Sequence, residues 1–355
     1  MNASKTVFVG LSGGVDSSVA ALRLIKEGYN VVGVFIKVWQ PDFLDCNWEA
    51  ERLDAMRVAA HLGIQFLTCD GVDAYRDEVG SYFIESYKKG LTPNPDVMCN
   101  KYVKFGVFLD FALANGADYV ATGHYAQREL LDAKFYLRRG VDTNKDQSYF
   151  LWTLTQTQLG KILFPCGNSP KSVIREEAEE AKLPTATKKD SQGVCFLGHI
   201  DIPEFLSNFV ELKEGAVLDI NNKVIGTHSG ALTFTLGQRH GFQVPGTTDS
   251  SGNPLFVVEK NIENNTITVA SEAPMITAKD KISLTDMNWI TALPSDEPLE
   301  AQFRYRQTPF SVKLTDVSTT KPQLTLEEST EQPALGQSCV LYRGDVLLGG
   351  GIISV

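Results

Sequence analysis

Apolar runs and amphipathic segments alternate through the first part of the chain. Residues 6–10 (TVFVG) and 31–36 (VVGVFI) are continuous apolar runs, as expected of strands that are buried on both faces. Between them, residues 15–25 place apolar side chains at the spacing of one helix face, and Gly28 follows as a C-terminal cap. The pattern predicts a strand, a helix and a second strand.

The same order returns twice further along the chain. Helical patterns at residues 51–63 and 105–116 each end near a glycine and lead into an apolar run. Such units predict right-handed crossovers and an α/β domain with a parallel sheet. Ligands bind at the carboxyl ends of parallel strands, where residues 10–18 (GLSGGVDSS) and 121–124 (ATGH) are expected to lie.

Beyond Phe209 the pattern changes to short strands. Residues 216–226 and 255–270 predict hairpins around asparagine turns, and strand patterns continue to the end of the chain. Breaks near Pro274 and Pro294 separate groups of strands. We therefore predict an α/β catalytic domain over residues 1–205, a small β-rich central domain over 206–276 and a C-terminal β-barrel over 277–355.

The composition is ordinary for a globular protein, with 43% hydrophobic and 21% charged residues among 355. No apolar run approaches the roughly 20 residues of a membrane helix, and the N-terminus enters a strand pattern too soon for a signal peptide. We expect a cytoplasmic protein without a membrane partner. The net charge of −10 disfavours a general nucleic-acid binder. Basic runs near Lys88, Arg138, Lys188 and Arg304 are either solvated surface or local binding patches.

The turn after the first strand is suited to an anion. Gly10, Gly13 and Gly14 allow backbone amides to approach a phosphate, and the N-terminus of the next helix adds positive potential. The turn has neither the lysine of a Walker-A loop nor a GxGxxG fingerprint. Asp16 would repel a phosphate unless Mg²⁺ lies between them, so a magnesium-bound pyrophosphate fits the turn. The alternative is an ordinary glycine turn in which Asp16 caps the helix.

Six cysteines are scattered without a CxxC pair, which in a reducing compartment argues against a zinc site or a disulfide framework. Cys99 follows a loop-forming sequence (TPNPDVM), and Lys101 and Lys104 are expected to lower the pKa of its thiol. Cys195 lies in a similar polar segment after Lys188. These two are candidate reactive thiols. The others fit buried apolar positions: Cys46, Cys69, Cys166 and Cys339.

The segment SGGVDSS at residues 12–18 resembles the PP-loop of the N-type ATP pyrophosphatases, which cleave ATP between its α- and β-phosphates and adenylate a substrate oxygen. Further motifs follow in chain order: the Cys99 segment, ATGHY, NKDQSYFL, the Cys195 segment, TLGQRHG, RYRQ, GQS and LGGGII. With them, essentially the whole chain resembles the bacterial tRNA-specific 2-thiouridylases. The resemblance implies a tRNA 2-thiouridine synthase that uses ATP and Mg²⁺.

The resemblance also implies roles for individual residues. Cys99 would be the nucleophile that faces the target base, Cys195 would carry the persulfide, and the two would form a transient disulfide. Asp96 would transfer a proton. ATP would be bound by Gly10, Leu11, Ser12, Gly13, Gly14, Val15, Asp16, Ser17, Ile36 and Gly123, with Asp16 as the magnesium ligand. Contacts to tRNA would come from Asn94, Pro95, Asp96, His124, Lys145, Asp146, Gln147, Arg304, Tyr305 and Gln337.

The chain departs from the family pattern at residues 36–51, where the match is loose, and near Asp132, where the segment is short. Ile36 stands where methionine is common, although a backbone contact to adenine would tolerate either residue.

The implied reaction replaces O2 of the wobble uridine in the tRNA anticodon with sulfur. ATP adenylates O2 and releases pyrophosphate, so that the oxygen can leave with AMP. A donor protein supplies sulfur to Cys195 as a persulfide, which either attacks C2 directly or is released by Cys99. Both routes end with a disulfide that a reductant must open.

Two other functions fit parts of the sequence. One is a PP-loop adenylating ligase or amidotransferase-like enzyme that acts on a small substrate, which would not need two reactive thiols. The other is a nucleotide-sensing binding protein without turnover.

Overall fold

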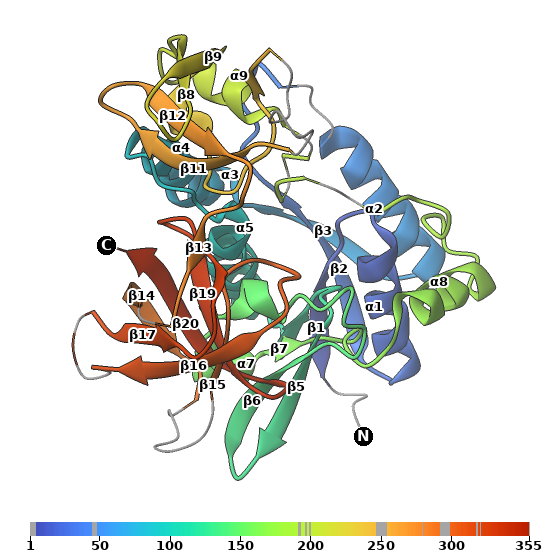
Figure 1. Cartoon of the computed structure of the whole chain (residues 1–355). Helices are drawn as coiled ribbons and strands as arrows, with labels where there is room; N and C mark the ends of the chain where they lie inside the picture. Colours follow the sequence, from blue (N-terminus) through green and yellow to red (C-terminus); the bar gives the residue numbers. More distant parts are fainter. Residues whose placement is uncertain are drawn as a thin grey trace.

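The structure is a computed structural model that describes residues 5–44, 48–190, 193–195, 197–198, 200–245, 254–278, 280–291, 299–316, 319 and 321–354. In Figure 1 a parallel sheet with helices on both faces is followed by a small β-sheet and by a C-terminal barrel. This order confirms the predicted fold class. Cys46 and the predicted break at Pro294 lie outside the described residues.

The N-terminal sheet is parallel throughout its strand pairs, in the order β3-β2-β1-β4-β7. Its strands are β1 (Thr6–Gly10), β2 (Asn30–Lys37), β3 (Gln65–Asp70), β4 (Tyr119–Ala121) and β7 (Ile162–Leu163). The two predicted apolar runs are β1 and β2, whose inner residues are buried because strands flank them on both sides. The edge strand β3 is less buried.

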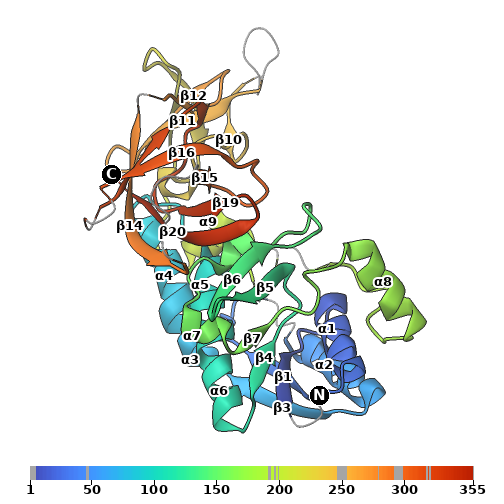
Figure 2. The same ribbon diagram turned by 90° about the horizontal axis from the view of Figure 1, so that it is seen from below.

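Helices cover both faces of this sheet (Figure 2). One face carries α1 (Val15–Lys26), α2 (Trp48–Leu62) and α8 (Lys171–Glu180), and the other carries α5 (Pro95–Met98) and α6 (Phe108–Ala114). Before them in the chain come α3 (Val72–Ala74) and α4 (Ser81–Lys88), and the buried residues of α4 belong to a separate core. Alternate residues of β1 point to opposite layers, since Val7 and Val9 belong to the core under α1 and Phe8 to the core under α6. As predicted, Gly28 follows α1 with a positive φ of 86°.

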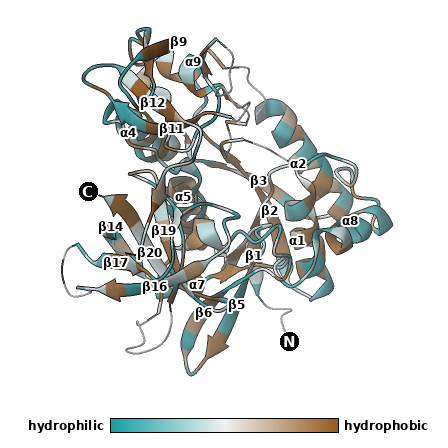
Figure 3. Ribbon diagram, viewed as in Figure 1, coloured by the Kyte–Doolittle hydropathy of each residue, from teal (hydrophilic) through white to brown (hydrophobic). Residues whose placement is uncertain are grey.

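Two π-helical turns, at residues 75–80 and 99–107, join the helices of the second layer. The second turn starts at Cys99. Two further helices, α7 (Gln156–Leu159) and α9 (Ile202–Ser207), lie near the boundaries with the β-rich parts of the chain. In Figure 3 the central strands are mostly hydrophobic, whereas the helices alternate hydrophobic and hydrophilic residues. None of the helices in the described ranges is long and apolar enough to cross a membrane.

The central part of the chain forms a five-stranded sheet in the order β10-β9-β8-β12-β11. Its strands are β8 (Gly215–Leu218), β9 (Val224–His228), β10 (Phe242–Gln243), β11 (Phe256–Asn261) and β12 (Thr266–Ala270). The predicted asparagine turns are present, because Asn222 joins β8 to β9 with φ 61° and Asn265 joins β11 to β12 with φ 50°.

The C-terminal part forms a closed six-stranded antiparallel barrel. Its strands are β14 (Lys281–Trp289), β15 (Leu299–Gln302), β16 (Phe310–Thr315), β17 (Gln323–Leu326), β19 (Ser338–Arg343) and β20 (Val346–Ser354). Pairing of β14 with both β17 and β20 closes the ring. A short ladder of β13 (Met275–Ile276) and β18 (Thr330–Glu331) lies beside it.

A hairpin that the sequence did not predict joins the α/β domain to the barrel. It consists of β5 (Ala126–Leu131) and β6 (Lys134–Arg139), and β6 pairs with β20 at Leu137↔Leu347. Leu137 is fully buried in a core that includes barrel residues such as Leu347. The basic run at Arg138 is structural, because Arg138 forms ion pairs with Glu129 (2.7 Å) and Asp345 (2.8 Å).

We predict that Leu137→Ala lowers the free energy of unfolding by about 2–5 kcal/mol, because it leaves a cavity where the hairpin meets the barrel. The matched control is Leu131→Ala at the hairpin tip, where the side chain is 51% exposed and the cost should be near zero. Urea unfolding followed by tryptophan fluorescence measures both. Equal costs for the two variants would show that the hairpin does not join the domains in this way.

Candidate active site

The glycine turn between β1 and α1 is held in one conformation by its own serines. Gly13 has φ 71°, a region that favours glycine, and Gly14 is extended before α1 begins. The backbone N–H of Ser12 donates to Ser17 Oγ (3.2 Å), and Ser18 Oγ donates to the Gly14 carbonyl (2.7 Å). The first N–H groups of a helix lack partners within the helix, so this turn can bind an anion.

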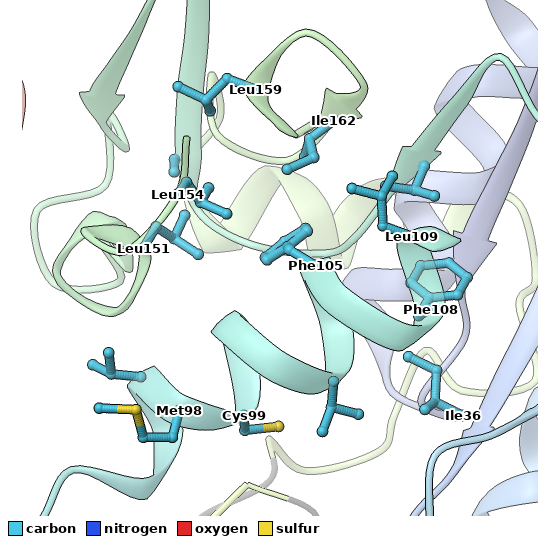
Figure 4. Close-up of a cluster of buried hydrophobic side chains, with 14 of the residues drawn as sticks. Ile36, Met98, Cys99, Phe105, Phe108, Leu109, Leu151, Leu154, Leu159 and Ile162 are labelled. Atoms are coloured by element: carbon cyan, nitrogen blue, oxygen red, sulfur yellow. The ribbon is translucent and has the colours of Figure 1, made fainter. Parts of the chain in front are cut away.

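The ends of β4 and β2 lie next to this turn. At Gly123, a Cβ atom would lie 2.7 Å from the Ser17 backbone nitrogen, so only glycine fits there. β2 continues past Val34, which pairs with Gly10, so Ile36 lies beyond the end of β1. The Ile36 side chain is buried in the core shown in Figure 4. A ligand would therefore meet its backbone, which suits the predicted tolerance of isoleucine.

The Asp16 carboxylate, beside the anion site, has two hydrogen-bond donors. Its Oδ1 accepts hydrogen bonds from the Tyr125 hydroxyl (2.6 Å) and from Lys171 Nζ (2.7 Å). Lys171 thus balances the negative charge of Asp16 beside the anion site. The prediction that only a metal ion could balance this charge is wrong. No local sequence pattern indicates Lys171, because 155 residues separate it from Asp16.

A second carboxylate, that of Asp190, binds Lys171 and two further cations. Asp190 forms ion pairs with Lys145 (2.6 Å), Lys171 (2.9 Å) and Arg175 (2.7 Å). Burial alone would raise the pKa of the Asp190 carboxyl, but the hydrogen bonds from Lys145 and Lys171 outweigh burial and lower it. Asp190 therefore stays ionised and holds these three cations near the turn.

The two candidate thiols lie together although 96 residues separate them, with Cys99 Sγ donating to Cys195 Sγ at 3.5 Å. Cys99 sits at the start of the π-helical turn after Met98, at the edge of the core in Figure 4. Its side chain is fully buried, whereas Cys195 is partly exposed. Cys69, Cys166 and Cys339 are buried, as predicted.

The two thiols differ in acidity, and the prediction that nearby lysines lower the pKa of the Cys99 thiol is wrong. Burial raises the pKa of the Cys99 thiol well above its usual range, and its hydrogen bond to Cys195 adds to this. The same hydrogen bond lowers the pKa of Cys195, and the ammonium of Lys104 lowers it further. Lys188, which the sequence suggested as the neighbour of Cys195, instead pairs with Asp54 (2.8 Å). Cys195 is therefore the more acidic thiol of the pair.

The Cys195 segment is tied to the second helical layer by two hydrogen bonds. The Cys195 N–H donates to Asp96 Oδ1 (2.9 Å), and the Tyr75 hydroxyl donates to the Cys195 carbonyl (2.7 Å). Asp96 lies in α5, which Asn94 caps by accepting from the Val97 N–H (3.3 Å). Burial raises the pKa of the Asp96 carboxyl, so Asp96 binds a proton more readily than an ordinary aspartate does.

A groove of about 480 Å³ lies next to the Cys195 segment, and we call it the Asn94 groove. Gly193 and Val194, which precede Cys195, form part of its lining together with aromatic residues of α4 and of the segment after β6. It also brings together six residues that the family resemblance implied as base or tRNA contacts: Asn94, Pro95, Asp96, Arg304, Tyr305 and Gln337. A second groove, of about 590 Å³, crosses the barrel and shares Arg304 and Tyr305 with the first.

The other implied tRNA contacts have partners inside the protein. His124 is buried, its Nδ1 lies 2.7 Å from Thr122 Oγ1, and burial lowers its pKa well below the usual value. Asp146 is buried and accepts from the Gly140 N–H (3.0 Å) and from Arg139 (3.0 Å). Gln147 accepts from the Tyr125 N–H (3.0 Å), and Lys145 pairs with Asp190. Their contacts to tRNA stay predictions.

The fold and this site define a class of protein: an α/β domain with a glycine-rich anion turn, followed by two β-rich parts that complete a groove. Three family models match in that order. The model described as "tRNA methyl transferase HUP domain" matches residues 5–199, the "tRNA methyl transferase PRC-barrel domain" matches 203–271, and the "Aminomethyltransferase beta-barrel domain" matches 279–353.

Curated relatives are similar over nearly the full length. The "tRNA-specific 2-thiouridylase MnmA" of Halalkalibacterium halodurans is 44% identical over 98% of this chain and 94% of its own. The protein of the same name from Chromobacterium violaceum is 43% identical over 98% of this chain and 92% of its own. This chain belongs to the tRNA-specific 2-thiouridylase family.

One solved structure, a 4-thiouridine synthetase–RNA complex with bound ATP, is 19% identical over 58% of this chain and 50% of that chain. Its TM-score of 0.36 is too low to support an argument about this molecule.

We predict that iodoacetamide alkylates Cys195 near neutral pH and leaves Cys99 unmodified, because Cys195 is partly exposed and the more acidic thiol, whereas Cys99 is buried and its pKa is raised. Lys104→Met should slow alkylation of Cys195 several-fold by raising its pKa. Lys101→Met is the matched control and should have little effect, since Lys101 is exposed and lies over the Tyr102 ring. Peptide mass spectrometry reads each cysteine separately. Faster labelling of Cys99 than of Cys195 would contradict the assignment.

Proposed function

We propose that this protein replaces O2 of the wobble uridine of tRNA with sulfur, with ATP as the activator. The observation that carries the proposal is the thiol pair, in which the Cys99 and Cys195 sulfurs lie 3.5 Å apart beside the Asn94 groove. Sulfur transfer through a persulfide requires two such sulfurs, whereas an adenylating ligase or a nucleotide sensor does not. Membership of the 2-thiouridylase family supports the same choice.

The glycine turn would bind the polyphosphate of ATP, with adenine near Ile36 and Gly123 at the ends of β2 and β4. Attack by uridine O2 on the α-phosphorus forms a P–O bond, and the bond to the β-phosphate breaks. Pyrophosphate leaves with the electron pair. This step matters because a carbonyl oxygen leaves poorly as hydroxide but well as part of AMP.

Asp16 fits the role of a magnesium ligand. One of its oxygens accepts from Lys171 and Tyr125, and a carboxylate offers about four lone-pair sites in all. In the described part of the chain, no three His, Cys, Asp or Glu side chains gather around one point, so phosphate oxygens and water would complete the coordination of the ion. Mg²⁺ is commonly bound by one or two carboxylates plus phosphates, and it would neutralise charge on the polyphosphate.

Cys195 would accept the sulfur, since it is the more acidic and more accessible thiol. In the direct route, the terminal persulfide sulfur attacks C2 and AMP leaves with O2. Cys99 then gives up its proton and attacks Cys195 Sγ, which breaks the S–S bond and leaves sulfur on C2. In the alternative route, Cys99 attacks first and releases hydrosulfide, which attacks C2. Each route oxidises two cysteines to a disulfide, and an external thiol reductant restores them.

Asp96 is suited to proton transfer in these steps. It lines the Asn94 groove, it contacts the Cys195 backbone, and its pKa is raised by burial. Asn94 and Pro95 would flank the flipped uridine, and a base in an anticodon loop leaves its stack at a cost of only a few kcal/mol.

The tRNA would lie across the two grooves, with Arg304, Tyr305 and Gln337 as contacts from the barrel side. Tyr305 lies 4.6 Å from Phe150 between ring centroids, so the groove offers an aromatic surface for a base. A single structured RNA held by local groups is compatible with the net charge of −10. We also propose that sulfur comes from a persulfide-carrying protein and that the reaction takes place in the cytoplasm.

The test is to incubate unmodified tRNA with the protein, ATP, Mg²⁺, a persulfide donor and a reductant, and to analyse nucleosides by mass spectrometry. We expect sulfur in place of oxygen at the wobble uridine, with one pyrophosphate per product. Cys195→Ser should still release pyrophosphate but transfer no sulfur, and Cys339→Ala in the barrel core is the matched control. Normal sulfur transfer by Cys195→Ser, or orthophosphate in place of pyrophosphate, would refute the proposal.

A further inference from the structure

The phosphate turn carries no lysine of its own, yet the pyrophosphate that leaves it is strongly anionic. We propose that Lys171, at the start of α8, is the polyphosphate-binding cation of the ATP site, so that the loop and its lysine come from opposite ends of the α/β domain. This inference rests on the proposed use of ATP at the glycine turn. It assigns a substrate contact that no motif in the sequence indicates.

The position of the Lys171 ammonium is fixed by two carboxylates. Its Nζ lies 2.7 Å from Asp16 Oδ1, in the first turn of α1, and 2.9 Å from Asp190 Oδ1. An ammonium has three N–H donors, so these two contacts leave one for a phosphate oxygen. The side chain is only 12% exposed, so it is held next to the turn and does not extend into solvent.

The helix that carries Lys171 is itself anchored to α1, the helix that follows the glycine turn. Arg23 of α1 forms an ion pair with Glu177 of α8 and donates to the Pro165 carbonyl (2.7 Å). The Lys171 N–H donates to Asp142 Oδ2 (2.9 Å), which caps the start of α8. These contacts hold Lys171 at a fixed position relative to the glycine turn. Binding of a phosphate by both groups requires such a fixed position.

The chemistry gives such a cation a defined role. As the bond between the α-phosphorus and the bridging oxygen breaks, negative charge accumulates on the departing pyrophosphate. A preorganised ammonium stabilises that charge at little cost in reorganisation. AMP lacks the β- and γ-phosphates, so its binding should not depend on Lys171.

The experiment compares binding of ATP, pyrophosphate and AMP by isothermal titration calorimetry. Lys171→Gln keeps an N–H donor for Asp16 but removes the charge, and Lys171→Met removes both. For both variants we expect the Kd of ATP and of pyrophosphate to rise about tenfold or more, the usual effect of losing a charged hydrogen bond. The Kd of AMP should stay nearly unchanged, and Lys171→Arg should recover much of the ATP affinity.

Lys182→Met, just beyond the other end of α8, is the matched control, since Lys182 is exposed. It should bind all three ligands like the parent protein. Unchanged ATP affinity in both Lys171 variants would overturn the inference, as would an equal loss for ATP and AMP. A thermal melt checks that each variant is folded, and Lys171→Arg supplies the answer if Lys171→Met is not.

The two proposals can fail separately. If the parent protein makes 2-thiouridine but its ATP affinity ignores Lys171, the inference is wrong and the proposed function stands. If ATP binding depends on Lys171 but no tRNA is thiolated, the proposed function is wrong and the phosphate contact stands.

Discussion

The distance of 3.5 Å between the sulfurs of Cys99 and Cys195 is the constraint on which the rest of this structure depends. The two residues come from different parts of the chain. Cys99 begins the π-helical turn after α5, and Cys195 lies between α8 and α9. Asp96 and Tyr75 hold the second segment over the first through two hydrogen bonds.

The segment that contains Cys195 also connects the glycine turn with the thiol pair. Asp190, shortly before Cys195 in the chain, is bound by Lys145, Lys171 and Arg175 beside the phosphate turn. Cys195 itself is bound beside the Asn94 groove. One short stretch of chain thus runs from the glycine turn, where we propose that ATP is cleaved, to the thiol pair, where we propose that sulfur is transferred. The groove is completed from the other side by Arg304, Tyr305 and Gln337, whose barrel is joined to the α/β domain through β6 and β20.

Features that depend on local sequence could be predicted well. The strands β1 and β2, the helix α1 with Gly28 after it, and the asparagine turns of the central hairpins follow from periodicity and turn chemistry. The pairing of Cys99 with Cys195 came from the family resemblance, since nothing in a separation of 96 residues indicates contact. Their electrostatics could not be predicted. Burial of Cys99 overrides its nearby lysines, and burial is a property of the folded core.

Long-range contacts account for the remaining differences. Lys171 meets Asp16 only because α8 packs against α1, and the β5–β6 hairpin joins the barrel because β6 pairs with β20. The family resemblance implied a tRNA contact for His124, and the structure packs its ring against Phe105 and Phe164. In each case the partner comes from a distant part of the chain.

The account is tested most directly by counting disulfides in a single turnover without reductant. The persulfide form of the protein is mixed with tRNA and ATP, and Cys99–Cys195 disulfides and thiolated uridines are quantified by mass spectrometry. The account predicts one disulfide for each sulfur transferred, and none when ATP is omitted. Sulfur transfer that leaves both cysteines reduced would contradict it.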